Sequence, residues 1–483
     1  MSFILELEPK SLWRHFDDIR KIPRPSGQEE AVGDHLVSFA EKLGLSHVRD
    51  SEGNIVIRKP GSKGHEDRPG VVLQSHTDMV CEKNSDKEFD FNKEAIQLVR
   101  QGDWLKADGT TLGADNGIGV ATALAILEDD SLVHGPLEAL FTVDEETGLI
   151  GAMSLAPDLL QGRVMLNLDS EDLGAFSIGC AGGRDTHILL PVSKKQPQGD
   201  TLLKIHLSGL RGGHSGVDIH EGRGNALKVL NRLLYQADKI MPLEIASFEG
   251  GDKHNAIPRE AIAQTVIQSE KVSKLQEWFE ERITEIKTEF SPVEKNISLE
   301  IARLNALPPN VLSGDSQKRL LALIFALPHG PLAMSRQIKS LVETSNNVAS
   351  IRCFDNQIKV HCSSRSSRDN ALVATLDKLI AIASLAAGTV EQPPGYPGWM
   401  PDLESPILKI SMDTFKEVAG KEARYEAIHA GLECGLIGKK FPGMDMISIG
   451  PTIKHPHSPD ECVEIKSVEL FYKHVLRILE VLA

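Results

Sequence analysis

The stretch Gly113-Ala-Asp-Asn-Gly-Ile-Gly119 places one carboxylate, that of Asp115, among three glycines and an alanine. The apolar run that follows at 120–127 predicts a buried helix. Glycines permit tight turns, and a helix that begins after Asp115 places amide donors near its carboxylate. We therefore expect this acid to be held rigidly where a loop meets a helix. Taken alone, the stretch also fits an ordinary N-cap Asp in a glycine-rich turn, so the rest of the chain must decide.

Polar residues follow three apolar segments that have the length and composition of buried strands. The endings are 71–75 before His76-Thr-Asp78, 137–143 before Asp144-Glu-Glu146, and 163–168 before Asp169. Enzymes of the α/β class place their chemistry at the carboxyl ends of such strands. The adjacent acids at 144–146 repel one another, which a solvated loop would tolerate and a metal ion would remove. With the Asp115 loop, these endings predict metal ligands that converge at one edge of a mostly parallel sheet.

The pattern changes after the glycine-rich segment 179–184, which we expect to be flexible. From residue 186 onward, alternating strands and amphipathic helices predict an open α+β domain that could contain two similar halves. The segment 393–398 is rich in proline and glycine and is typical of a linker. We therefore expect an α/β catalytic domain formed by 1–185 and 391–483, with an α+β domain inserted at 186–390.

Length, charge and cysteine usage narrow the class of protein. A chain of 483 residues favours two domains. Its net charge of −15 argues against a nucleic-acid partner, because an acidic surface repels phosphates. We find no apolar run of the ~18 residues that a membrane helix needs, and no signal peptide in residues 1–8. The six cysteines are scattered, which is typical of reduced thiols, so we expect a cytoplasmic protein without a membrane partner.

The candidate metal ligands comprise two imidazoles and three carboxylates. They are His76, Asp115, Glu146, Asp169 and His457. Zinc accepts nitrogen and oxygen ligands, and a carboxylate can bridge two ions. Two ions ~3.5–4 Å apart that share a carboxylate and a water form a hydrolytic centre used by aminopeptidases.

Several motifs, in a fixed order along nearly the whole chain, resemble one enzyme family. They are SHTDMV at 75–80, TTLGADNGIG at 110–119, DEETG at 144–148, NLDSED at 167–172, GGHSG at 212–216, HAGLECG at 429–435 and HSPDE at 457–461. This sequence resembles the zinc-dependent aminoacylase/carboxypeptidase/dipeptidase superfamily and, within it, the carnosinase-like aminoacyl-histidine dipeptidases. The resemblance implies a parallel-sheet, di-zinc catalytic domain with an inserted lid domain. Cobalt or manganese could replace the two zinc ions.

The resemblance also implies roles for individual residues. Asp115 would bridge the two ions and form a cis peptide bond with Asn116. One ion would add His76 and Asp169, and the other would add Glu146 and His457. His457 is preferred to His455 because it begins the HSPDE motif. The remaining roles are Glu145 as general base, Asp78 as the residue that holds His76, and His214 as a donor to the oxyanion.

Substrate contacts are implied at Asn255, Arg365, Gly431 and Glu433. A dipeptidase must hold a free carboxylate, a free amine or both, and Arg365 could pair with a carboxylate through two hydrogen bonds. Asn255 could bond the substrate backbone. For Arg365 and Asn255, an ordinary turn or surface residue remains the alternative interpretation.

The resulting hypothesis is a metal-dependent peptidase that hydrolyses dipeptides, including those that end in histidine. A related tripeptidase, carboxypeptidase or deacylase is the alternative within the enzyme class. A non-enzymatic binding relative is the alternative outside it, although such relatives usually lose a ligand or the base, and all of these residues are present. A homodimer is possible, since simple members of the superfamily dimerise through the lid.

Overall fold

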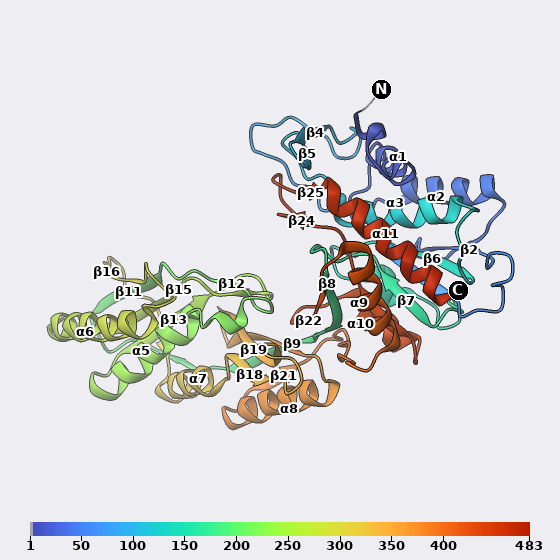
Figure 1. Ribbon diagram of the computed structural model, residues 1–483. Helices are drawn as coiled ribbons and strands as arrows, with labels where there is room; N and C mark the ends of the chain where they lie inside the picture. The colour runs from blue at the N-terminus through green and yellow to red at the C-terminus, as the bar shows by residue number, and fades with distance from the viewer. Residues whose placement is uncertain (1–2) are drawn as a thin grey trace. The chain divides into compact units, whose positions relative to one another are not determined.

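The structure, a computed structural model, describes residues 3–483, which form two compact units (Figure 1). The first unit runs to Cys180 and includes Trp399–Ala427 and Leu432–Ala483, and the second comprises Ala181–Gly398 and Ile428–Gly431. These junctions differ from the expected boundaries at 185/186 and 390/391. The strand β9 (Gly182–Pro191) begins the sheet of the second unit, and Gly183 in it forms a β-bridge with Tyr396. The segment 393–398 therefore belongs to the second unit.

The first unit is built on an eight-stranded sheet with a parallel centre. In sheet order its strands are β1 (Ser46–Arg49), β2 (Ile55–Lys59), β6 (Leu137–Thr142), β3 (Val71–His76), β7 (Val164–Asn167), β23 (Asp445–Ser448), β8 (Ala175–Cys180) and β22 (Arg424–Ile428). The pairs β6·β3, β3·β7 and β7·β23 are parallel, whereas β1, β2 and β8 form antiparallel pairs. Every residue of β3 and β6 is buried, as expected for parallel strands covered on both faces.

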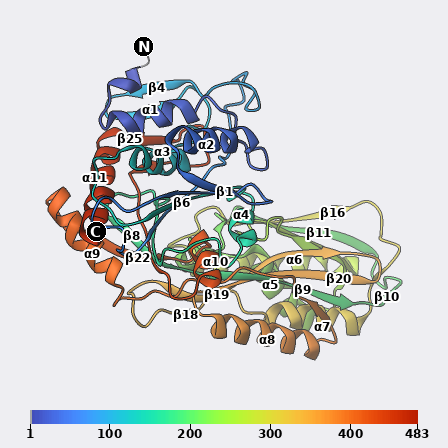
Figure 2. The same cartoon turned by 90° about the vertical axis from the view of Figure 1, so that its right-hand side faces the viewer.

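The predicted apolar run at 120–127 lies in α3, one of the helices of the first unit. These helices are η1 (Phe3–Glu6), α1 (Lys10–Ile19), α2 (Glu30–Leu43), α3 (Ala114–Glu128), α4 (Ile150–Ser154), α9 (Pro406–Ala419), α10 (Glu433–Lys440) and α11 (Ile465–Leu482). Figure 2 shows α1, α2 and α3 together on one side of the sheet. The buried residues of α3 lie on all sides of the helix, and α3 contacts α1, α11 and β3. A helix that is apolar all round belongs in a core, so α3 is a rigid support for the Asp115 loop.

A small antiparallel sheet in the same unit carries the His457 loop. Its strands, in order, are β24 (Ile453–Lys454), β25 (Cys462–Glu464), β5 (Trp104–Ala107) and β4 (Leu98–Gln101). The pairing of β24 with β25 makes residues 455–461 the loop of a hairpin. Since β25 also pairs with β5, the end of this loop is fixed to the core of the unit.

The second unit contains a nine-stranded sheet and four long helices. The path of the sheet is β16 (Ser298–Leu304), β11 (Thr201–Ser208), β15 (Ala261–Ile267), β13 (Glu244–Gly250), β19 (Val342–Cys353), β20 (Gln357–Ser366), β9 and β21 (Thr389–Glu391), with β18 (Gly330–Met334) beside β19. The helices are α5 (Ala226–Ile240), α6 (Val272–Phe290), α7 (Gly314–Ala326) and α8 (Asp369–Leu385), and the short elements are β10 (Lys194–Lys195), β12 (Gly213–His214), β14 (Ala256–Ile257), β17 (Val311–Leu312), η2 (Ile219–Glu221) and η3 (Ser269–Lys271).

The second unit consists of two halves with the same topology. The first half follows the order β11-α5-β13-β15-α6-β16, and the second follows β9-α7-β19-β20-α8-β21. In both halves, the fourth of these strands lies beside the first, then come the third and the second. A single residue pair, Gly250 with Ile351, joins β13 to β19 and so links the halves into one sheet. The two similar halves that the sequence suggested are therefore present.

The described residues include no helix long and apolar enough to cross a membrane. All six cysteines are unpaired.

Candidate metal centre

The parallel strands of the first unit deliver the candidate ligands to one edge of the sheet. His76 is the last residue of β3 and pairs in register with Thr142, the last residue of β6. Glu145 and Glu146 lie just beyond that end. Gln74 pairs in register with Asn167, so Asp169 follows the end of β7 at the same edge. Because parallel strands end together, side chains that are distant in sequence meet here.

The distances between ligand atoms define two overlapping groups. His76 Nε2 lies 3.0 Å from Asp115 Oδ1 and 3.3 Å from Asp169 Oδ1. His457 Nε2 lies 3.2 Å from Asp115 Oδ2 and 3.1 Å from Glu146 Oε2. In each group of three residues, the ligand atoms lie within 4.8 Å of one another. Asp115 belongs to both groups, with one oxygen in each.

The residues at this edge suit divalent cations. Glu146 Oε1 is buried and has no hydrogen-bond partner among residues 3–483. Burial, together with the Asp115 carboxylate nearby, raises the pKa of Asp169 to about 6 and that of Glu171 to about 8. Buried carboxylates are costly without a compensating charge. A set of imidazole nitrogens and carboxylate oxygens with one shared carboxylate fits two ions of the zinc, cobalt or manganese type.

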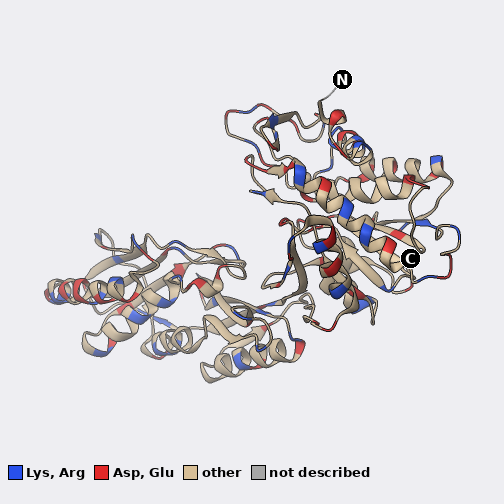
Figure 3. Cartoon of the chain, in the orientation of Figure 1, with Lys and Arg blue, Asp and Glu red and all other residues tan. Residues whose placement is uncertain are grey.

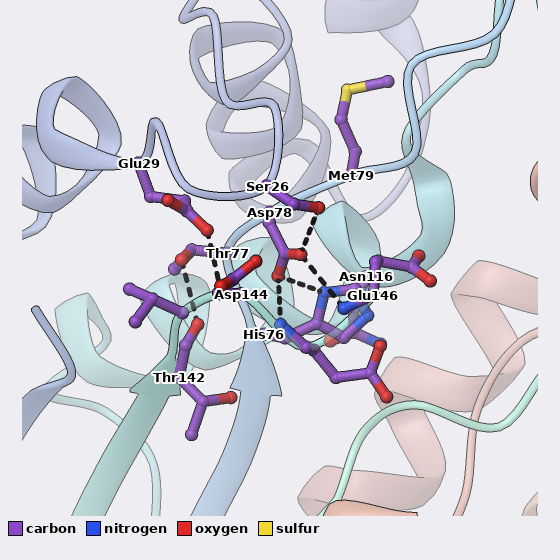
Figure 4. A network of polar contacts seen from close by, with 12 residues as sticks. Ser26, Glu29, His76, Thr77, Asp78, Met79, Asn116, Thr142, Asp144 and Glu146 are labelled. Atoms are coloured by element: carbon purple, nitrogen blue, oxygen red, sulfur yellow. Dashed lines mark hydrogen bonds and ion pairs between the residues drawn. The ribbon is translucent and has the colours of Figure 1, made fainter. Parts of the chain in front are cut away.

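Asp78 connects three parts of the centre (Figure 4). Its Oδ1 lies 3.2 Å from His76 Nδ1, whereas the other imidazole nitrogen, Nε2, faces Asp115. The same carboxylate accepts the backbone N–H groups of Glu145 and Glu146, both at 3.1 Å, and the Ser26 hydroxyl at 2.7 Å. Burial opposes ionisation of Asp78, but the hydrogen bonds from His76 and Ser26 outweigh it and lower its pKa to about 2.

Glu145 has the electrostatic setting of a proton acceptor. Burial is the main cause of a pKa well above the ordinary value, and the carboxylates of Asp169, Glu433 and Glu146 add to it. A base with a raised pKa binds a proton more readily at neutral pH. The geometry also groups Glu145 with His76 and Glu146 as possible ligands, so distances alone do not divide the two acids into base and ligand.

The backbone at Asp115 departs from helical geometry, although the residue lies within the first turn of α3. The N-cap is Gly113, with a left-handed φ of 69°, and Asp115 has φ −78° and ψ 112°. Asp115 is therefore not the N-cap that the simpler interpretation assumed. The Asp115–Asn116 peptide bond is cis, as expected. The Asn116 side chain donates to the Leu168 carbonyl oxygen at 2.7 Å, which ties this turn to the segment that carries Asp169.

Four of the remaining site candidates belong to the second unit: His214, Asn255, Arg365 and Gly431. His214 Nδ1 accepts backbone N–H groups from Val217 at 3.0 Å and Gly216 at 3.3 Å. A nitrogen that accepts hydrogen bonds carries no proton, so the neutral ring holds its proton on Nε2. Burial, with Arg365 nearby, lowers the pKa of His214 to about 4 and keeps the ring neutral. His214 Nε2 is thus a hydrogen-bond donor.

Arg365 is buried on β20, and its Nη1 donates to the Tyr396 hydroxyl at 2.7 Å. Its Nε is buried without a hydrogen-bond partner among residues 3–483. An ordinary surface arginine would not leave a buried donor unpaired. Gly431 packs against Tyr396, because a Cβ atom at this glycine would lie 2.7 Å from Tyr396 Cε2. Asn255 is exposed, and its carbonyl oxygen accepts the N–H of Ser215, next to His214.

Glu433 belongs to the first unit and is 2% exposed. Its Oε2 accepts hydrogen bonds from Gln74 Nε2 at 2.6 Å and Thr142 Oγ1 at 2.8 Å. Both partners lie at the carboxyl ends of β3 and β6. Glu433 Oε2 is therefore fixed to the strand ends beneath the candidate ligands, whereas its Oε1 is buried without a hydrogen-bond partner among residues 3–483.

Arg24, Ser26 and Glu461 contact residues of the centre, although nothing in the sequence predicted a role for them. No role was predicted for His429 of the second unit either. His429 Nε2 lies 2.7 Å from Ser345 Oγ within the second unit, and burial lowers its pKa to about 3. Glu461 and His429 stand inside the motifs HSPDE and HAGLECG, which was the only signal available for them.

Comparison with known proteins identifies the class. The family model for Peptidase family M20/M25/M40 matches residues 72–481, so the chain belongs to this family and is a peptidase. The family resemblance seen in the motifs is thereby confirmed. The α/β unit with an inserted α+β unit is the architecture that the resemblance implied.

Two relatives match over nearly their full length. The cytosol non-specific dipeptidase of Escherichia coli K12 is 42% identical over 481 residues, which cover 99% of each chain. The crystal structure of aminoacylhistidine dipeptidase from Vibrio alginolyticus superposes with a TM-score of 0.91 at 42% identity, covering 99% of this chain and 98% of that one. A tripeptidase from Staphylococcus aureus shares the fold, with a TM-score of 0.56 at 18% identity and 99% coverage of both chains.

Proposed function

We propose that this chain hydrolyses dipeptides, including Xaa-His dipeptides such as carnosine, at a centre that holds two metal ions. The observation that carries the proposal is Asp115, whose two carboxylate oxygens each face a separate histidine and a separate second carboxylate. Such a shared carboxylate is the arrangement that two-metal hydrolases need. The names of the Escherichia coli and Vibrio alginolyticus relatives support dipeptides as substrates.

We assign two zinc ions to the centre, with cobalt or manganese as possible replacements. Asp115 would bridge them, His76 and Asp169 would complete one site, and Glu146 and His457 would complete the other. Bound divalent cations would supply Lewis acidity and lower the pKa of a shared water toward neutrality. Asp78 would hold the imidazole of His76 in place and strengthen it as a ligand.

Proton transfer is assigned to Glu145. Its carboxylate would take a proton from the attacking water and pass it to the leaving nitrogen of the peptide. The raised pKa of Glu145 supports this role, because the group must hold a proton between these two steps. Its backbone N–H bonds to Asp78, which fixes the loop while leaving the Glu145 side chain available.

We assign the second unit the role of a lid that supplies substrate contacts. His214 Nε2, as the protonated nitrogen of a neutral ring, would donate to the oxyanion. Arg365 would pair with the free carboxylate of the dipeptide, since its Nε is buried without a partner among the described residues. Asn255 would contact the substrate backbone, and Gly431, which packs against Tyr396, would also contact the substrate. Glu433 would also contact the substrate, since its Oε1 is buried without a hydrogen-bond partner among the described residues.

A substrate panel tests the proposal against its alternatives. Metal-free protein should be loaded separately with zinc, cobalt and manganese and assayed on Xaa-His dipeptides, other dipeptides, tripeptides and N-acetyl amino acids. We expect dipeptides to be hydrolysed fastest and chelation to abolish turnover. Preference for tripeptides or N-acetyl amino acids would assign the chain to a related tripeptidase or deacylase. Full activity without metal would reject the mechanism, and no hydrolysis with any metal would favour a binding protein.

Location and assembly complete the proposal. The name of the Escherichia coli relative supports a cytoplasmic location. A homodimer is supported by α8, on which the apolar side chains of Val373, Ile380 and Leu385 are 53%, 39% and 90% exposed. The corresponding helix of the other half, α6, instead carries many charged side chains (Figure 3). Light scattering should give the mass of a dimer, and Ile380→Glu should shift it to a monomer, whereas Ile240→Glu on α5 should not.

A further inference from the structure

Glu461 is a buried carboxylate that the assignment of roles above does not use. It is 2% exposed and lies at the end of the 455–461 loop, directly before β25. The loop also carries His457, so Glu461 and one candidate ligand share a short segment. A buried carboxylate needs hydrogen-bond donors or a counter-charge, because its desolvation is otherwise costly.

Four consecutive backbone N–H groups satisfy this carboxylate. Glu461 Oε2 accepts from Leu112 at 2.7 Å and Gly113 at 2.9 Å. Its Oε1 accepts from Ala114 at 2.8 Å and from Asp115 itself at 3.3 Å. Both oxygens therefore act only as acceptors, and each faces two donors. An ionised carboxylate can serve four donors in this way, whereas a neutral amide cannot.

Arg24 holds the opposite side of the same turn. It is 2% exposed, and its Nη2 donates to the Gly113 carbonyl oxygen. Its Nη1 donates to the carbonyl oxygens of Thr77 at 2.9 Å and Asp78 at 2.7 Å. The turn that presents Asp115 is thus fixed between a buried cation, which bonds its carbonyl group, and a buried anion, which bonds its amides.

The backbone of the His457 loop needs such an attachment. His455 and His457 have φ angles of 54° and 59°, in the left-handed region that non-glycine residues seldom occupy. The Ser458 hydroxyl donates to the His455 carbonyl oxygen at 2.9 Å, and the Glu461 N–H donates to the Ser458 carbonyl oxygen at 3.0 Å. The loop is therefore a folded turn whose far end, at Glu461, is bonded to the turn of Asp115.

We propose that Glu461 is a positioning residue that sets the distance between Asp115 and His457, and through the shared Asp115 controls the affinity of both metal ions. This inference rests on the two-metal centre proposed above. Glu461 reaches Asp115 through the backbone and does not touch the ligand atoms of either group. Loss of one Glu461 acceptor would loosen the Asp115 turn, which both ligand groups share, so the affinity for both ions would fall.

Glu461→Gln would replace one carboxylate oxygen by an amide N–H₂ group, which would then face two backbone N–H donors. In competition with a chromophoric chelator, zinc should bind the variant ~10–100-fold more weakly at both sites, the usual effect of altering a residue that supports ligands. Excess zinc should restore most of the turnover, with KM little changed. The Co²⁺ absorption spectrum should change in intensity, because the ligand geometry changes.

Glu138→Gln is the matched control. Glu138 is also buried in the first unit, and its Oε2 accepts backbone N–H groups from Gln161 at 2.8 Å and Gly162 at 2.7 Å. It pairs with Arg58 and lies near the amino end of β6, away from the ligands. We expect it to lose stability but to keep wild-type zinc affinity. Equal loss of zinc affinity in both variants would show that Glu461 acts only through general stability and would overturn the proposal.

Two further outcomes decide the matter. If Glu461→Gln binds both ions with wild-type affinity, or binds only one of them more weakly, the proposal that Glu461 controls both affinities through Asp115 is overturned. If this variant does not fold, Glu461→Asp keeps the charge but shortens the reach, and it should show the same weakening of both ions to a smaller degree. Failure of the wild-type protein itself to bind two zinc ions would reject the two-metal centre, which is a different result from any of these.

Discussion

Gly113 lies so close to Arg24 that a Cβ atom on this glycine would be 2.5 Å from Arg24 Nη2. Gly113 also has a φ of 69°, which favours glycine. Gly113→Ala should therefore lower the free energy of unfolding by about 1–2 kcal/mol for the left-handed backbone and by a further 1–3 kcal/mol for the displaced arginine. Gly44→Ala is the control, because Gly44 has a φ of 65° but nothing within 4 Å of its Cβ position.

Chemical denaturation of the two metal-free variants measures the difference. Gly44→Ala should show only the smaller, backbone cost. Gly113→Ala should in addition bind zinc more weakly, because Arg24 and Asp115 are attached to the same turn. Equal destabilisation of both variants would mean that Arg24 moves aside without cost.

Glu145→Gln should keep the metal ions and lose turnover. The substitution removes the proton acceptor, and a general base contributes ~10²–10⁴-fold to the rate. We therefore expect a loss of at least ~10²-fold in kcat, with unchanged metal content by atomic absorption.

Glu146→Gln provides the comparison, since Glu146 lies 3.1 Å from His457 Nε2 and should be a ligand. This variant should lose one ion. If Glu145→Gln loses metal and Glu146→Gln keeps it, the two acids exchange roles.

Asp78→Asn should lower the affinity for the metal ion that His76 would bind by ~10–100-fold. The amide cannot accept hydrogen bonds at both positions, so either His76 or the backbone of the 145–146 loop loses its partner. Asp50→Asn is a suitable control, because the Asp50 carboxylate likewise accepts backbone N–H groups, from Glu52, Gly53 and Asn54, in a loop away from the ligands. Zinc competition should separate the two variants, and equal affinities would contradict the role of Asp78.

His214→Ala should lower kcat by ~10²–10³-fold, the usual contribution of one oxyanion donor, with a smaller change in KM. Metal content and the free energy of unfolding should stay near wild-type values. Near-normal turnover would show that His214 is only a turn residue.

A mixture of His214→Ala with Glu145→Gln tests where the donor comes from. Recovered activity in mixed dimers would place the His214 of one chain at the metal centre of another. Absence of recovery, with subunit exchange demonstrated, would favour action within one chain.

Acid should destabilise the first unit through His474. This histidine is buried against Phe176 and Phe415, and burial lowers its pKa to about 4 from the ordinary 6.5. Because the folded-state pKa is below the unfolded value, the unfolded state binds more protons between these two pH values. The free energy of unfolding should thus fall as the pH drops from 6.5 to 4, by up to about 3 kcal/mol from this group.

His474→Asn should remove this contribution. In denaturation experiments, its free energy of unfolding should depend on pH with a slope about one proton smaller than that of wild type in this range. Above pH 6.5, the two slopes should agree. Identical slopes throughout would contradict the assignment.

The sequence was sufficient to predict that His76, Glu146 and Asp169 lie at one edge of the sheet, because these residues follow the ends of buried strands. Asp115 was found from its glycine-rich stretch, and His457 from the HSPDE motif. Buried apolar runs such as 137–143 can be recognised locally, and parallel strands bring their carboxyl ends together without further information. The attachments of Arg24 and Glu461 could not be predicted, because they depend on which backbone groups become buried after folding. Pro23-Arg-Pro25 indicated only a break between two helices.

The glycines of the segment 179–184 lie in the strands β8 and β9 and not in a loop, and the junction between the two units falls within this segment. Its flexibility stays a prediction. A Cβ atom at Gly182 would lie 2.5 Å from the Gly398 nitrogen, and one at Gly183 would lie 2.5 Å from the Tyr396 hydroxyl. These glycines allow close approach between chain segments, which a single sequence does not distinguish from freedom to bend.

The order of elements along the chain determines when the enzyme can become active during its synthesis. The ribosome releases β3, β6 and β7 first, then the whole second unit, and only afterwards β23 and the hairpin that carries His457 and Glu461. A nascent chain therefore contains the candidate ligands His76, Asp115 and Asp169 long before His457 is synthesised. The proposed pair of ligand groups is therefore incomplete until the segment with His457 has been synthesised, so we expect a chain that lacks this segment not to cleave peptides.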